Sequence, residues 1–175
     1  VHVYGCPCDT EGFRRLAEKY SLKIVYDAAH AFGVDGLADS GDMSMYSFHS
    51  TKLFHSCEGG ALVFRDPALR EKLRELRNFA IRGETACVDV GTNAKMNELQ
   101  ALMGLACLEK MDEILAHRRR IYDTYVRAFD GCAGVELFTR SRNKSYVPVL
   151  FADEAARERV YEGLRSCNVF ARRYF

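Results

Sequence analysis

Two side chains with useful chemistry lie at or just beyond the ends of short apolar runs in the first third of the sequence. Asp27 directly follows Ile24-Val25-Tyr26, and Lys52 lies in a loop five positions beyond Ser47, near the end of a second run. An acid at a strand end can keep a ring nitrogen protonated, and a lysine amine partly removed from water becomes a better nucleophile. Ligands bind at the carboxyl ends of strands in open parallel sheets. Asp27, Ser47 and Lys52 are therefore candidates for one ligand site.

Alternating strand and helix patterns surround these residues and predict an α/β fold. Apolar residues at i, i+3, i+4 and i+7 predict a one-sided core helix that begins at Asp9 or Thr10. Short apolar runs bounded by turn residues predict strands, and a second helix follows Pro67. Such alternation favours a mostly parallel sheet covered on both faces. The predicted strands are 23–26, 43–48 and 61–64.

The second half of the sequence predicts a long helix and then a change of pattern. Residues 81–92 are expected to be irregular, and an apolar stripe from Met96 to about Phe129 predicts a helix with a bend. Glycines at 131 and 134 then end this pattern. We therefore expect two units, residues 1–130 and the beginning of a smaller unit at 131–175. In the smaller unit the pattern predicts a strand at 145–151, a helix at 153–167 and an extended segment at 169–175.

Composition limits the possible partners. The 25 Lys and Arg residues nearly balance the 24 Asp and Glu residues, so a net charge of +1 gives no support for binding to nucleic acid or an anionic membrane. No apolar run approaches the roughly 20 residues of a membrane span, and the start lacks signal-peptide features. The seven scattered cysteines are typical of reduced thiols. We expect a soluble cytoplasmic protein, and the start at Val1 indicates a piece of a longer chain.

Three segments of the sequence are Asp27-Ala28-Ala29-His30, Ser47-Phe48-His49-Ser50-Thr51-Lys52-Leu53-Phe54-His55-Ser56-Cys57-Glu58-Gly59-Gly60 and Gly91-Thr92-Asn93-Ala94-Lys95-Met96-Asn97-Glu98-Leu99. In this order and spacing they resemble the pyridoxal-phosphate-dependent sugar aminotransferases of the DegT/DnrJ/EryC1/StrS family. The likeness extends from the first strand-like residues to Arg172-Arg173-Tyr174-Phe175. It implies a partial aspartate-aminotransferase-like large domain of fold type I, with a mostly parallel sheet, and the start of a small α+β domain.

The resemblance implies a role for each matching residue. Lys52 matches the lysine that holds pyridoxal 5'-phosphate covalently and moves the substrate proton, and Asp27 matches the acid paired with the pyridine nitrogen. His30 occupies the position beside the ring hydroxyl, and Ser47 matches the phosphate-binding serine. Asn93 matches the asparagine that reaches the cofactor phosphate of the neighbouring subunit, which implies a homodimer with shared sites.

The same resemblance implies the reaction. Glutamate would donate an amino group, and a nucleotide-linked keto-deoxysugar, especially a dTDP-linked one, would accept it. Related dehydratases of the family have a histidine where the lysine stands, so Lys52 favours transamination. The family also has an N-terminal part with a Gly-Thr phosphate segment and an aromatic ring that stacks on the cofactor. We expect the chain without these parts to bind the cofactor weakly or not at all.

Other interpretations stay open at this point. Lys52 could be a surface lysine, Asp27 or Asn93 a helix cap and Ser47 a strand serine. The chain could also be a folded fragment without catalysis, or a partner-binding domain. His49 and His55 could line the substrate pocket or make loop contacts. A zinc site lacks the usual ligand spacing, and its candidate ligands are His30, His49, His55, Cys57 and Glu58.

Overall fold

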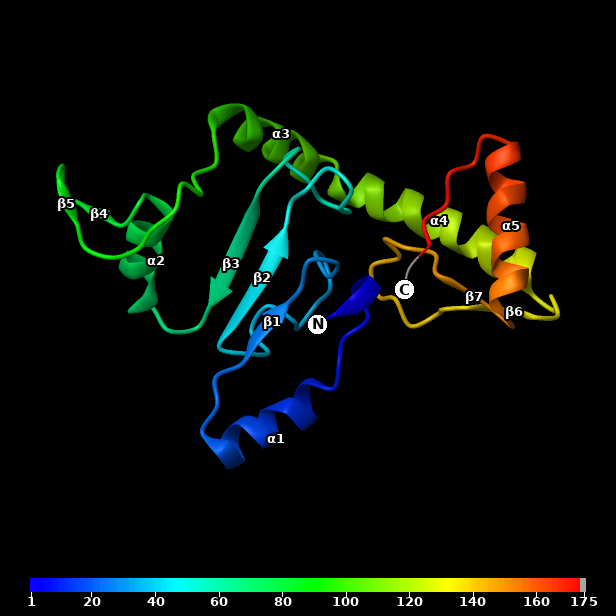
Figure 1. The fold of residues 1–175 in the computed structure, drawn as a ribbon, viewed down its shortest axis with the longest axis horizontal. Helices are drawn as coiled ribbons and strands as arrows, with labels where there is room; N and C mark the ends of the chain where they lie inside the picture. Colours follow the sequence, from blue (N-terminus) through cyan, green and yellow to red (C-terminus); the bar gives the residue numbers. More distant parts are fainter. Residues whose placement is uncertain (174–175) are drawn as a thin grey trace.

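Three strands form one sheet in the computed structural model, which describes residues 1–173 (Figure 1). Strands β1 (Val25–Asp27) and β2 (Met43–Ser47) are parallel, and β3 (Gly60–Phe64) is antiparallel to β2. The α/β prediction is confirmed. The expected parallel arrangement applies only to β1 and β2, because the loop at 48–59 returns the chain directly, without the crossover that a parallel neighbour needs.

The core lies on one face of this sheet. Successive β2 residues alternate between the faces, so Ser44 and Tyr46 are buried while their neighbours are half-buried. The turns after β1 cover this face. Val25 on β1 is 64% exposed, so the other face is partly open. The core cluster consists of Ala28, Ala31, Val34, Leu37 and Tyr46, with Phe32, Phe48 and Val63 packed against it.

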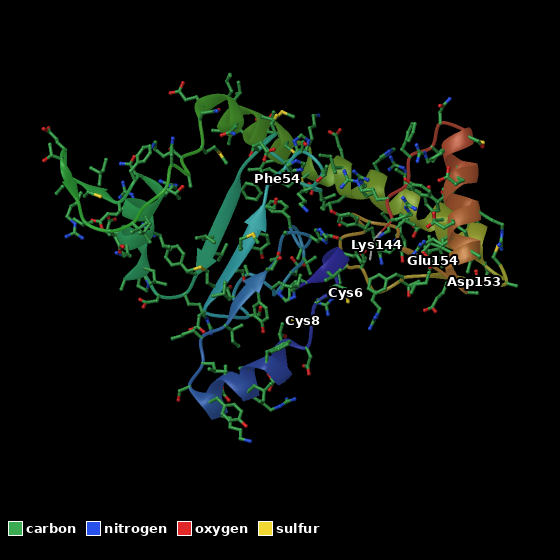
Figure 2. All side chains as sticks on the ribbon, viewed as in Figure 1. Cys6, Cys8, Phe54, Lys144, Asp153 and Glu154 are labelled. Carbon is green, nitrogen blue, oxygen red and sulfur yellow. The ribbon has the colours of Figure 1, made fainter. Side chains whose placement is uncertain are left out.

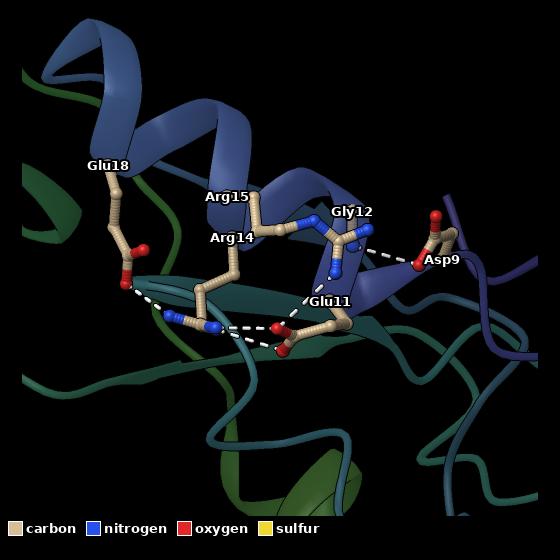
Figure 3. Close-up of polar contacts among 6 residues, drawn as sticks. All are labelled: Asp9, Glu11, Gly12, Arg14, Arg15 and Glu18. Carbon is tan, nitrogen blue, oxygen red and sulfur yellow. Dashed lines mark hydrogen bonds and ion pairs between the residues drawn. The ribbon is translucent and has the colours of Figure 1, made fainter.

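Helix α1 (Thr10–Tyr20) forms where its capping residue predicts it. The Asp9 carboxylate accepts the Gly12 N–H at 2.8 Å, and Arg14 forms ion pairs with Glu11 and Glu18 along the exposed side (Figure 3). The prediction that the apolar side of this helix packs into the core is wrong for the described residues. About half of the surface of each of its large side chains is exposed, because periodicity shows which side is apolar but not what covers it; these side chains are Phe13, Leu16 and Tyr20.

Helix α2 (Leu69–Arg77) is followed by a small hairpin where we expected irregular structure. Strands β4 (Ile81–Arg82) and β5 (Ala86–Cys87) are antiparallel. The turn between them contains Gly83 at φ +65°, a backbone conformation that glycine adopts without strain. The two strands are too short to give a periodic signal in the sequence.

The predicted long helix is two helices, α3 (Glu98–Glu109) and α4 (Met111–Phe129), which meet at Lys110. A Cβ at Gly104 would lie 3.6 Å from the ring of Phe54, which Figure 2 labels, so α3 packs closely over the loop after β2. The expected apolar stripe on α3 is largely uncovered by the described residues, and Leu99 is 78% exposed.

The C-terminal part contains β6 (Val135–Leu137), β7 (Val149–Phe151) and α5 (Glu154–Ser166). The two strands pair antiparallel, and the coil between them lies beside the turn η1 (Val3–Gly5) near the N-terminus (Figure 1). No strand was predicted at β6, and the predicted strand at 145–151 begins before β7 does. Residues 169–173 form no regular element, and the last two residues of that prediction lie outside the described residues. Within residues 1–173, no helix is long and apolar enough to cross a membrane.

Candidate functional site

Asp27 ends β1 at the edge where the predicted site lies. Its backbone carbonyl accepts the His2 N–H at 2.9 Å, and its side chain accepts the Ala29 N–H at 3.0 Å. The interpretation of Asp27 as a helix cap is wrong, because a turn and not a helix follows it; the carboxylate accepts an N–H of that turn. This bond fixes one carboxylate oxygen at the carboxyl end of a strand, which is where open sheets bind ligands.

His30 lies in the turn that follows and is held from several sides. Its Nδ1 accepts the Tyr4 backbone N–H at 3.2 Å, so a neutral ring carries its proton on Nε2. The ring centroid lies 4.6 Å from that of Tyr146 and 5.8 Å from that of Tyr4. Burial lowers the pKa of His30 from its ordinary value, the positive charge of Lys52 lowers it further, and the Asp27 carboxylate raises it.

The charges of Lys52 and Asp27 thus act in opposite directions on the pKa of His30. Lys52 and Asp27 come from different strand ends, 25 positions apart in the sequence, and both act on His30. The structure places all three residues at or just beyond the carboxyl ends of β1 and β2. The Lys52 side chain is half-buried, and its role in the site stays a prediction.

The loop after β2 places Ser47 and Lys52. Ser47 pairs with Gly60 at the end of β2, and its hydroxyl accepts the His49 N–H at 3.4 Å. The Lys52 N–H then donates to the His49 carbonyl at 2.9 Å, which forms a tight turn. The Phe48 N–H donates to the Gly59 carbonyl at 2.8 Å and closes the base of the loop.

His49 and His55 make local contacts in this loop. His49 Nδ1 lies 2.8 Å from the Thr51 hydroxyl, and its Nε2 lies 3.5 Å from the Glu58 carboxylate. His55 Nδ1 accepts the Cys57 N–H at 3.5 Å. Their expected place in a substrate pocket stays a prediction. In the described part of the chain, no three His, Cys, Asp or Glu side chains gather where a metal ion could bind, so the zinc alternative has no assembled ligand set.

Asn93 lies apart from the other predicted residues. It is exposed and pairs with Asn78 in an isolated bridge, in the extended segment between β5 and α3. It does not cap the long helix, because Asn97 takes that role: its side chain accepts the Gln100 N–H, and the Gln100 side chain accepts the Asn97 N–H. The structure does not bring Asn93 to the site within one chain.

The residues that enclose His30 were not predicted from the sequence. Tyr4 and Tyr146 contact the ring, and Asn143 donates hydrogen bonds to the backbone carbonyls of His30 and Phe32. Two of these residues come from the coil between β6 and β7, more than 110 positions away from His30. No local spacing could have indicated this contact, because the fold alone brings the segments together.

The donor set fits the polar groups of pyridoxal 5'-phosphate. Asp27 offers a carboxylate for a protonated ring nitrogen, Lys52 an amine for the aldehyde, and Ser47 a hydroxyl for the phosphate. His30 adds an Nε2–H donor beside them, because its Nδ1 is already paired. All four residues lie at or just beyond the ends of the two parallel strands.

Comparisons with known proteins cover the whole chain. Residues 1–175 match the model of the DegT/DnrJ/EryC1/StrS aminotransferase family. A dTDP-4-amino-4,6-dideoxy-D-glucose transaminase of Shigella dysenteriae is 40% identical, over 100% of this chain and 50% of the relative. A dTDP-3-amino-3,4,6-trideoxy-alpha-D-glucose transaminase of Streptomyces venezuelae is 34% identical, over 78% and 38%.

Solved structures agree with these relatives. The crystal structure of DesI in the presence of its TDP-sugar product has a TM-score of 0.89 and 36% identity, and the match covers 99% of this chain and 47% of DesI. A putative PLP-dependent aminotransferase from Bacillus cereus has a TM-score of 0.84 and 29% identity, with 99% and 50% covered. The chain spans about half the length of the curated relatives it matches. The chain belongs to the DegT/DnrJ/EryC1/StrS aminotransferase family, whose cofactor is pyridoxal 5'-phosphate.

Proposed function

We propose that this chain carries the lysine half of the active site of a pyridoxal-phosphate-dependent sugar aminotransferase. The observation that carries the proposal is that Asp27 and Ser47 end the parallel strands β1 and β2, with His30 and Lys52 in the turns that follow. Lys52 is a half-buried amine, Asp27 an acid at a strand end, and His30 an imidazole with one nitrogen already paired. This combination is typical of a site that binds a ligand and transfers protons.

Each residue has a defined task in this proposal. When bound, pyridoxal phosphate supplies an electron sink beside the carbon that loses or gains a proton. Lys52 binds the cofactor through its amine and, once free, carries the proton to and from that carbon. Asp27 keeps a proton on the ring nitrogen, His30 donates from Nε2 to the ring hydroxyl, and Ser47 donates its hydroxyl to the phosphate.

We further propose a dTDP-linked keto-deoxysugar as amino acceptor and glutamate as donor. The support for the sugar comes from relatives that are named as dTDP-sugar transaminases and from the likeness to DesI. His49 and His55, on the loop that carries Lys52, are the proposed pocket residues. The near-neutral charge of the chain agrees with a cytoplasmic metabolic enzyme, which we propose as its setting.

A homodimer with shared sites is part of the same proposal. Asn93 is exposed and lies outside its own chain's site, as expected for a residue that reaches the cofactor phosphate of a partner. The exposed leucines of α3 follow it directly and form an apolar surface of the kind that interfaces cover. We also keep the proposed division near residue 130, since α4 ends at Phe129 and glycines 131 and 134 have positive φ.

Covalent trapping tests the central assignment. The chain is incubated with excess pyridoxal phosphate and treated with borohydride, which fixes the cofactor on a lysine amine as a stable secondary amine. Because the reduction is irreversible, it also captures weak binding. We expect one label per chain, on Lys52 by peptide mass spectrometry, and its loss in Lys52→Ala. The matched control is Lys23→Ala, which removes an exposed lysine.

Equal labelling of Lys52→Ala and the unmodified chain would contradict the assignment. Labelling spread evenly over many exposed lysines would contradict it as well, because Lys52 would then be no more reactive than an ordinary surface amine. A folded chain that takes no label at any cofactor concentration would support the alternative of a non-catalytic or partner-binding domain. For the longer protein, amine transfer from glutamate to dTDP-linked keto sugars is the corresponding assay.

A further inference from the structure

A polar segment, residues 141–146, joins the C-terminal part of the chain to the His30 turn, and two of its side chains are buried. Ser141 and Asn143 are only 1% and 5% exposed, although most serines and asparagines lie on protein surfaces. The coil that carries them lies between β6 and β7, and Lys144 on it is marked in Figure 2. Buried polar side chains are kept where their hydrogen bonds are complete, so each bond of Asn143 indicates what the segment is built to hold.

The Asn143 amide holds the turn that contains His30. Its Nδ2 donates to the backbone carbonyls of His30 and Phe32, both at 2.9 Å. Its Oδ1 accepts the Ser145 hydroxyl at 2.9 Å and the Ser145 N–H at 3.3 Å. Both donors and both acceptor sites of the amide are thus in use. The two donor bonds fix the carbonyls on either side of the buried Ala31.

The opposite side of Asn143 is enclosed by the N-terminal turn. A Cβ on Gly5 would lie 2.2 Å from the Asn143 side-chain oxygen, and Gly5 has φ +73°, so only glycine fits there. The Arg142 N–H donates to the Gly5 carbonyl at 3.0 Å. Tyr4 has φ +54°, an uncommon conformation for a non-glycine residue. Its N–H is the donor to His30 Nδ1.

We propose that Asn143 is a positioning residue that fixes the His30 imidazole for the cofactor. Asn143 holds the His30 turn against η1, and this contact keeps the Tyr4 N–H on Nδ1 and leaves Nε2–H without a hydrogen-bond acceptor among residues 1–173. Tyr146, three positions further on, packs against the same ring. The site is therefore completed by a segment from beyond the proposed division at residue 130. The inference rests on the proposed function only in taking His30 as a cofactor contact.

The experiment reads the state of His30 in the chain without cofactor. Nitrogen-15 NMR of the imidazole distinguishes the two neutral tautomers, and His30→Gln identifies the signals. In the unmodified chain above pH 8 we expect the Nε2–H tautomer alone. In Asn143→Ala we expect a mixture of both tautomers, and a midpoint of the His30 titration that moves up toward the ordinary value of 6.5. Asn168→Ala, at an exposed asparagine, is the control and should leave both unchanged.

A folded Asn143→Ala variant with an unchanged His30 tautomer and titration would overturn the proposal. If that variant does not fold, Asn143→Asp decides by the tautomer alone. It keeps the shape and the acceptor for Ser145 but loses the donors to the two carbonyls, and Asn168→Asp controls for the added charge. The result is independent of labelling at Lys52. A changed tautomer in the variant, with no labelling of Lys52, would support the positioning role and contradict the proposed function. An unchanged tautomer, with labelling of Lys52, would contradict the positioning role and support the proposed function.

Discussion

Tyr122 connects α4 to the coil that reaches the site, and its substitution gives a sharp test of how this part of the chain is held together. The side chain is 3% exposed, its hydroxyl donates to the Phe138 carbonyl at 3.0 Å, and the Lys144 ammonium lies 4.3 Å from the centre of its ring. Tyr122→Phe removes only the hydroxyl, whereas Tyr122→Ala also removes the ring on which the coil packs.

The two losses differ in size. A net hydrogen bond contributes about 1 kcal/mol to the free energy of unfolding, and the unpaired Phe138 carbonyl adds to the loss. We therefore expect Tyr122→Phe to cost about 1.5 kcal/mol. Truncation of a buried aromatic ring to alanine costs about 4 kcal/mol, because a cavity remains. The contact of Lys144 with the ring is kept in Phe and lost in Ala.

Urea unfolding followed by circular dichroism measures both values. Tyr125→Phe on the same helix is the matched control, since Tyr125 is 43% exposed, and we expect its loss to be below about 0.5 kcal/mol. Equal losses for Tyr122→Phe and Tyr125→Phe would refute the argument that the bond to Phe138 stabilises the fold. A loss for Tyr122→Ala no larger than that for Tyr122→Phe would refute the packing argument.

Two further predictions concern pH and a helix cap. His2 is fully buried, and burial lowers its pKa below the ordinary value of 6.5. As the pH falls, the imidazole of the unfolded chain therefore takes up a proton before that of the folded chain. The stabilisation is complete above pH 6.5 and is lost as the pH drops through the folded pKa, by at most about 1.4 kcal/mol per pH unit for this group. Urea midpoints between pH 7.5 and 5.5 should show this fall, with a shallower slope in His2→Gln; an unchanged slope would contradict it. Asn97→Ala should cost about 1 kcal/mol by the same assay, since it removes the cap of α3; Gln100→Ala should cost less, and a larger loss would count against the cap.

Sequence signals within a few residues were enough to predict the helices and strands that are fixed by neighbouring residues. Asp9 accepts the N–H three residues later, so a capping residue before an apolar period was enough to place α1. The structure shows that Asp153 caps α5 in the same way. The strand that ends at Asp27 was equally clear, because turn residues follow a short apolar run. The place of Lys52 and Ser47 followed from these strand ends together with the family resemblance.

The enclosure of His30 had no such local cause. Asn143 reads as a coil asparagine in the sequence, and only the assembled chain shows its two bonds to the His30 turn. Burial was also beyond prediction for α1 and α3, because an apolar stripe shows which side of a helix avoids water. It does not show whether the described residues or another polypeptide cover that side.

The separation of Asn143 from His30 has a consequence for folding order. The bond between them spans 113 positions, and the length-dependent part of the entropy of closing such a loop is about 4 kcal/mol. Contacts at such separation form late, so we expect β1, β2 and the Lys52 loop to acquire structure before His30 is fixed. Pulsed hydrogen exchange during refolding would show this as later protection of the Arg142 N–H, which bonds Gly5, than of the Ala28 N–H, which bonds Met45; simultaneous protection would contradict it. The lysine would then be in place before the imidazole that completes its surroundings.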